Sequence, residues 1–130
     1  MKTKDEKEWM EQAEYDLRAA EKMFETGIFP YCVFMCHLSI EKALKAAYYF
    51  KLKSEPPKIH DLSKLCALSN LSPPQDIQDS IDKLSTVSVT ARYPEEIRHA
   101  LKGYTKISTK ATLKNTRMVI AWLKEQLNLA

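Results

Sequence analysis

Residues 31–50, YCVFMCHLSIEKALKAAYYF, form a stretch that no other segment of the chain resembles. Its clearly polar members are His37, Ser39, Glu41, Lys42 and Lys45. At about 100° per residue, Glu41, Lys45 and Lys42 lie within roughly 140° of His37 on a helix, and apolar side chains cover most of the rest. Because neighbours must bury such a helix on several sides, we predict the central helix of a small bundle. Its three charges and histidine exclude a membrane span.

Length and composition indicate one domain over residues 1–130. A chain of 130 residues buries enough surface to fold without disulfides or metals. Two glycines and long helical periodicity favour an all-α protein. The three cysteines are an odd number with no CxxC pair, and no secretory signal precedes them. We therefore expect buried, reduced thiols and a cytoplasmic location.

The charges are distributed unevenly along the chain. Residues 1–30 carry five basic and eight acidic side chains, residues 31–96 carry eight of each, and residues 97–130 carry seven basic residues against Glu125 alone. The acidic first helix and the basic tail could pair within one chain, pair between subunits, or leave the tail free for polyanions.

The first two helices have clear start and stop signals. Thr3 and Glu6 fit a capping box, and Gly27 suits the left-handed conformation that ends many helices. Pro30 suits the first turn of the second helix, which we expect to end near Lys53, before two prolines. The short connection makes the two helices antiparallel neighbours.

Three further helices are predicted after them. Asp61 can cap a short helix, and a box-like SPPQ sequence at residues 72–75 starts the next one. Residues 86–107 are expected to be extended or looped, and Ser108 or Thr109 to cap the last helix. The inward residues are Leu62, Leu65, Leu68, Ile77, Ile81, Leu84, Leu113, Ile120, Leu123 and Leu127, with Trp122 near the edge. The predicted fold is an antiparallel four-helix up-and-down bundle plus one short helix.

Four lysines, at positions 102, 106, 110 and 114, recur every fourth residue. On a helix they would form a basic ridge, although the expected start of the last helix places part of it on the loop. This charge fits phosphate contacts and an acidic partner protein equally well.

Four segments together resemble the HEPN family: AEYDLRAA at 13–20, EKALKA at 41–46, HDL at 60–62 and ARYP at 91–94. The resemblance covers nearly the whole chain. It implies an antiparallel helical bundle, commonly a homodimer, that acts with a minimal nucleotidyltransferase as a two-component or toxin–antitoxin pair. The family has been proposed to bind nucleotides, and several of its branches are metal-independent ribonucleases.

The ribonuclease branches use an arginine followed by a histidine, and Arg92 and His99 have a permitted spacing, with six residues between them. A histidine can move a proton from a ribose 2′-hydroxyl while an arginine holds the phosphate. Tyr93 follows the arginine where active branches have a small polar residue, and Leu101 replaces the tyrosine of toxin versions. We therefore prefer a nucleotide- or RNA-binding dimeric module, with the ribonuclease as the alternative.

For the binding function, we expect Lys45 and Arg92 to hold a nucleotide or RNA phosphate, with Glu41 orienting Lys45 and His60 reaching the same pocket. The remaining expected binding residues are His37, Lys42 and Tyr93. The alternatives are a solvated stripe or a satisfied polar cluster on helix two, and a helix cap with its neighbour at positions 60 and 61. Cys32 and Cys36 lack a third and fourth ligand, so we expect no metal and no cofactor.

Overall fold

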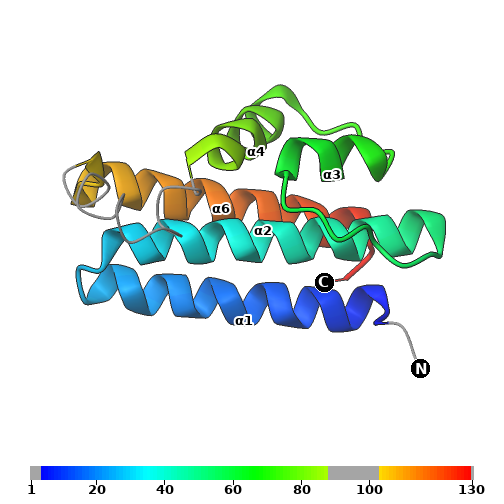
Figure 1. Ribbon diagram of the computed structural model, residues 1–130, viewed down its shortest axis with the longest axis horizontal. Coiled ribbons are helices and arrows are strands. Elements are labelled where there is room, and N and C mark those ends of the chain that lie inside the picture. Colours follow the sequence, from blue (N-terminus) through cyan, green and yellow to red (C-terminus); the bar gives the residue numbers. More distant parts are fainter. Residues whose placement is uncertain (1–3, 88–102, 130) are drawn as a thin grey trace.

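The computed structural model describes residues 4–87 and 103–129. The regular structure of this part of the chain is entirely helical, as predicted (Figure 1). Its helices are α1 (Glu6–Glu25), α2 (Phe29–Leu52), α3 (Leu62–Leu68), α4 (Gln75–Val87) and α6 (Lys106–Gln126).

Helix α2 is the centre of the bundle and contacts α1, α3, α4 and α6. In Figure 1, α1 and α4 run in the opposite direction to α2 and α6, with the short α3 beside α4. The two ends of the chain lie at the same end of the bundle (Figure 1). The antiparallel four-helix bundle with one short helix is therefore confirmed.

Small residues bring α1 and α2 close together. Ala13 and Ala20 of α1 and Ala43 of α2 are fully buried. The buried Ser39 hydroxyl donates a 2.7 Å hydrogen bond to the carbonyl oxygen of Ala13. Because such short side chains fill little space between the backbones, α1 packs along α2 and positions the polar side chains of α2 next to it.

Most helix ends follow the sequence signals. Gly27 has φ 78°, and Lys53 takes a left-handed conformation directly after α2, with φ 53°. Pro30 lies in the first turn of α2, and the Asp61 carboxylate caps α3 by accepting from the Lys64 amide at 3.1 Å. The inward residues predicted for the last two helices are all buried, and Trp122 is half-buried. Of those predicted for the short α3, Leu62 and Leu65 are buried, but Leu68 in its last position is 42% exposed, so that prediction is wrong.

Two predicted caps are wrong. The Asp5 side chain caps α1, accepting from the Glu8 amide at 2.9 Å, so α1 begins at Glu6. Thr105 caps α6 in a reciprocal box with Ser108, which occupies the third helical position. In both cases another oxygen nearby reaches the free amides, a choice that short sequence patterns do not decide.

The segment 86–107, predicted to be extended or looped, is helical at both of its ends, because α4 continues to Val87 and α6 begins at Lys106. Residues 88–102 of this segment lie outside the described residues. Lys106, Lys110 and Lys114 therefore all lie on α6, and the expected position of Lys106 on a loop is corrected. None of the described helices is long and apolar enough to cross a membrane.

Candidate functional site

The predicted polar stripe of α2 is a buried cluster around the Glu41 carboxylate. One oxygen, Oε2, lies 3.2 Å from Lys45 Nζ, and the other, Oε1, lies 3.8 Å from His37 Nδ1. The side chains of His37, Glu41 and Lys45 are only 3%, 6% and 10% exposed. The stripe is therefore not solvated, and the charges of Glu41 and Lys45 largely offset each other.

His60 reaches this cluster from the segment before α3. Its Nδ1 lies 3.1 Å from both oxygens of Glu41, while 61% of its side chain is exposed. The next two residues fix its position, because Asp61 caps α3 and Leu62 is fully buried. Asp61 also accepts from the Ser85 hydroxyl of α4 at 3.2 Å. The cap and the contact with Glu41 coexist, so the two alternatives for residues 60 and 61 do not exclude each other.

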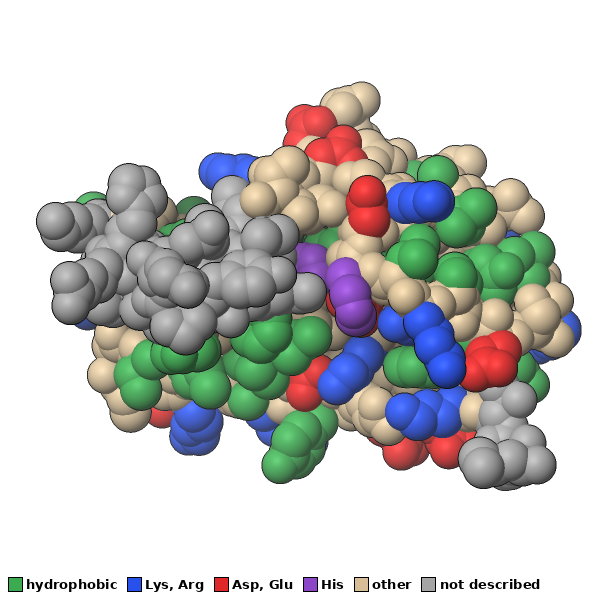
Figure 2. Space-filling view, viewed as in Figure 1, with side chains coloured by type: hydrophobic (Ala, Val, Ile, Leu, Met, Phe, Trp, Pro, Cys, Tyr) green, Lys and Arg blue, Asp and Glu red, His purple; other side chains and the backbone are tan. Residues whose placement is uncertain are grey.

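Helix α1 closes the other side of the cluster. Lys42 Nζ lies 2.7 Å from Asp16 Oδ2, and Asp16 is buried. Lys45 Nζ lies 5.7 Å from the centre of the Trp9 ring, and Lys4 Nζ lies 4.4 Å from it. Both lysines predicted to bind on α2 are thus tied to carboxylates of the protein itself. Of the predicted binding residues that the structure describes, His60 is the most exposed, and Figure 2 shows histidine side chains at this surface.

Three predicted site residues, Arg92, Tyr93 and His99, lie outside the described residues. The convergence of Arg92 with Lys45 and the pairing of Arg92 with His99 therefore stay predictions.

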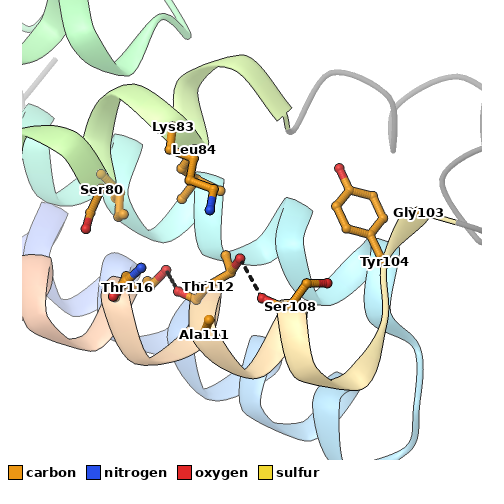
Figure 3. Close-up of a pocket in the computed structure, with 11 residues that line it drawn as sticks. Ser80, Lys83, Leu84, Gly103, Tyr104, Ser108, Ala111, Thr112 and Thr116 are labelled. Carbon is orange, nitrogen blue, oxygen red and sulfur yellow. Dashed lines mark hydrogen bonds between the residues drawn. The ribbon is translucent and has the colours of Figure 1, made fainter.

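A cavity that the sequence did not predict lies between α4 and α6. Its volume is about 180 Å³. Ile40 and Leu84 contribute apolar surface, and Figure 3 shows Ser80 and Lys83 of α4 across from the α6 side chains, with Tyr104 at one end. The polar α6 side chains that line it are Ser108, Thr112, Asn115 and Thr116.

Hydroxyl groups that line the cavity donate their protons within the protein, so they present acceptor oxygens to a ligand and few donors remain free. The hydroxyls of Thr112 and Thr116 donate to carbonyl oxygens one turn back in α6, at 3.1 and 2.8 Å. The Asn115 amide and the Lys83 ammonium make no hydrogen bond or ion pair within residues 4–87 and 103–129. These two groups can therefore donate to a ligand. No sequence signal marked the cavity, since it depends on how α4 crosses α6.

Lys106, Lys110 and Lys114 form an exposed row on α6, which we call the basic ridge. Among the described residues, none of the three pairs with a carboxylate. Two other basic residues of α6 do pair with α1: Arg117 with Glu21 at 3.1 Å and Lys124 with Glu14 at 3.2 Å. The acidic and basic ends of the sequence thus pair partly within one chain, and the ridge stays available.

The three cysteines are free thiols and buried, as predicted. The Cys36 thiol is hydrogen-bonded to Cys32, which lowers the pKa of Cys32 and, together with burial, raises the pKa of Cys36 well above its usual range. Burial raises the pKa of the Cys66 thiol. Over the part of the chain that the structure covers, no three His, Cys, Asp or Glu side chains gather as metal ligands.

The architecture is similar to that of known proteins. Among curated proteins, none is similar enough in sequence to count as a match. Two crystal structures share the fold at low sequence identity. TT1696 from Thermus thermophilus is 23% identical with a TM-score of 0.80, covering 94% of this chain and 98% of that one. ST0689, described as an archaeal HEPN homologue, is 22% identical with a TM-score of 0.77, covering 96% of this chain and 99% of that one. The model of the HEPN domain matches residues 6–126, so the chain belongs to the HEPN domain family.

Proposed function

We propose that this chain is a nucleotide- or RNA-binding module that acts as a homodimer with a minimal nucleotidyltransferase, in a two-component or toxin–antitoxin system of the cytoplasm. The observation that carries the binding function is the α4–α6 cavity. The basic ridge lies on another face of the same α6 helix. Family membership supports the partner and the dimer.

The cavity suits a base better than a whole nucleotide. Its volume of about 180 Å³ is below the roughly 300–1,000 Å³ of sites for drug-sized ligands. A base can stack on the Tyr104 ring, and the Asn115 amide can donate to its edge. The Lys83 ammonium can then donate a charge-assisted hydrogen bond to the phosphate of the same nucleotide at the rim of the cavity.

The basic ridge supplies the attraction for a longer polyanion. Its lysines follow one another at every fourth residue, about 6 Å apart along the helix axis. Uncompensated lysines bind phosphates by releasing counterions, and this gives affinity a steep dependence on salt. His60 is retained in the proposal as the exposed member of the cluster around Glu41.

Binding to fluorescent single-stranded RNA and to mononucleotides in EDTA tests this proposal. We expect RNA affinity to fall with salt and Tyr104→Leu to weaken it about tenfold, since stacking contributes about 1–3 kcal/mol per base. Tyr15→Leu is the matched control, because Tyr15 is an exposed tyrosine of α1 away from the cavity. Absence of binding, or equal affinities for the two variants, would contradict the proposal.

The partner is tested separately. A neighbouring gene for a nucleotidyltransferase with a Gly-Ser and paired-aspartate signature is expected, and the two proteins should co-purify after co-expression. Light scattering after size exclusion should give the mass of a dimer, and a monomer at all concentrations would contradict that part.

The alternative proposal is a metal-independent ribonuclease that uses Arg92 and His99, supported by their spacing in the sequence. Cleavage of RNA in EDTA that is lost in His99→Ala would establish it. Intact RNA under conditions of saturated binding would leave the binding module as the function.

A further inference from the structure

The exposed imidazole of His60 contacts the buried carboxylate of Glu41. Its Nδ1 lies 3.1 Å from each oxygen of Glu41, which is 6% exposed, whereas the His60 side chain is 61% exposed. An ionised carboxylate only accepts hydrogen bonds, so Nδ1 must carry the proton. In the neutral ring, Nε2 is then the nitrogen with the lone pair.

Further contacts fix the positions of both the Glu41 carboxylate and the His60 imidazole. Lys45 Nζ binds Glu41 Oε2 at 3.2 Å, so the carboxylate cannot swing away without leaving a buried ammonium unpaired. On the other side, Asp61 is bonded to both the start of α3 and Ser85 of α4. The imidazole is therefore oriented, whereas an ordinary surface histidine rotates freely.

The location of His60 distinguishes it from a residue in a substrate cleft. It is not among the residues that line the α4–α6 cavity, and its side chain is largely open to solvent. Figure 2 shows histidine at the outer surface, next to basic and acidic side chains. His37, which approaches the same carboxylate at 3.8 Å, is only 3% exposed. Because the oriented imidazole of His60 lies on an open surface, it suits reaction with a small molecule that approaches from the solvent.

We propose that His60 accepts a transferable phosphoryl group on Nε2. The Nε2 lone pair attacks the phosphorus of an acyl phosphate or a phosphoramidate. The new N–P bond forms as the donor's P–O or P–N bond breaks, and the carboxylate or ammonia leaves with the bonding electrons. The ring gains positive charge while Nδ1 keeps its proton, and the adjacent Glu41 carboxylate offsets that charge. His60 is also retained in the proposed binding function, but the phosphoryl transfer to Nε2 requires neither a bound nucleotide nor RNA.

Incubation of the folded protein with potassium phosphoramidate or, separately, acetyl phosphate tests the proposal. Intact mass and phosphorus NMR should show one acid-labile phosphoryl group on Nε2 of His60, absent in His60→Gln. A peptide of residues 56–64 provides the same histidine without Glu41. We expect the protein to react about tenfold faster than the peptide, and Glu41→Gln to react at the rate of the peptide. Equal rates for protein and peptide, attachment to Nδ1, or reaction at another histidine would overturn the proposal.

Glu41→Gln removes a buried charge, so its fold is checked by circular dichroism. A measurement on the unaltered protein keeps the proposal falsifiable if this variant does not fold. Long-range proton–nitrogen correlation spectra report which ring nitrogen carries the proton. We expect the proton on Nδ1 of His60, and a neutral ring protonated on Nε2 would overturn the proposal.

Discussion

Lys42 and Lys45 of α2 and the three lysines of the basic ridge on α6 all lie on helices, but they differ in their partners. Lys45 lies 3.2 Å from Glu41 and Lys42 lies 2.7 Å from Asp16. The basic ridge on α6 has no carboxylate partner among the described residues and is exposed. A count of charges along the sequence treats all of these lysines alike. The comparison shows that carboxylates on the same or a neighbouring helix decide which cations remain available to a ligand.

The difference leads to opposite expectations for the two groups. Changes around the α2 lysines should alter the free energy of unfolding, because their partners are buried. Changes in the basic ridge should alter binding to polyanions and leave stability nearly constant.

The largest effect is expected for Glu41→Ala. It leaves the 10% exposed Lys45 without its counter-charge and should lower the free energy of unfolding by about 3–5 kcal/mol. Urea denaturation followed by circular dichroism measures this. In the control Glu41→Leu with Lys45→Met, which removes both charges, most of the stability should return. A single variant as stable as the wild type would show that the pair is effectively solvated.

The second effect is on binding. Replacing Lys106, Lys110 and Lys114 together by glutamine should weaken single-stranded RNA binding roughly tenfold or more. The slope of log affinity against log salt should decrease by about 2, at about 0.7 for each lost phosphate contact. Fluorescence anisotropy at several salt concentrations measures both.

The control for the ridge variant is Lys22, Lys51 and Lys64 replaced together, since these exposed lysines lie on other helices. If the two triple variants lose the same affinity, the ridge has no special role and only net charge matters.

A smaller loss of stability is expected for Lys42→Gln. The variant leaves the buried Asp16 carboxylate without the ammonium that lies 2.7 Å away, at a cost of about 1–3 kcal/mol. Lys51→Gln on the same helix is exposed and should change stability by less than about 0.5 kcal/mol. Thermal unfolding compares the two variants, and identical midpoints would refute the importance of the Asp16 contact.

The smallest effect is expected for Arg117→Gln. Its ion pair with Glu21 joins side chains that are 50% and 36% exposed, so its loss should cost about 0.2–1 kcal/mol. The difference should shrink in high salt because exposed pairs are screened. A loss above about 2 kcal/mol, measured by denaturation at low salt, would place this pair with the buried ones.

Helix order and core could be predicted from the sequence because they depend on periodicity and strong breakers. The apolar residues of α2 and the stop at Gly27 are local signals, and both agree with the structure. The caps at Asp5 and Thr105 were missed because several neighbouring side chains can satisfy the same free amides.

The candidate site was less predictable. The sequence placed His37, Glu41 and Lys45 on one face, but burial of that face depends on α1 and the segment before α3. The two-oxygen contact between Glu41 and His60 joins residues 19 positions apart, so no local pattern encodes it. The α4–α6 cavity likewise arises from packing. The roles of Arg92, Tyr93 and His99 stay predictions, because these residues lie outside the described parts of the chain.

The chain ends lie together at one end of the bundle, while the first turn of α6, with Lys106, is at the opposite end (Figure 1). A helix of this length spans about 30 Å. An affinity tag or reporter protein joined at either terminus would therefore emerge far from Tyr104 and the first turn of α6. Surface immobilisation through a terminus, for sensor measurements with RNA or nucleotides, should leave that end of the molecule facing the solution.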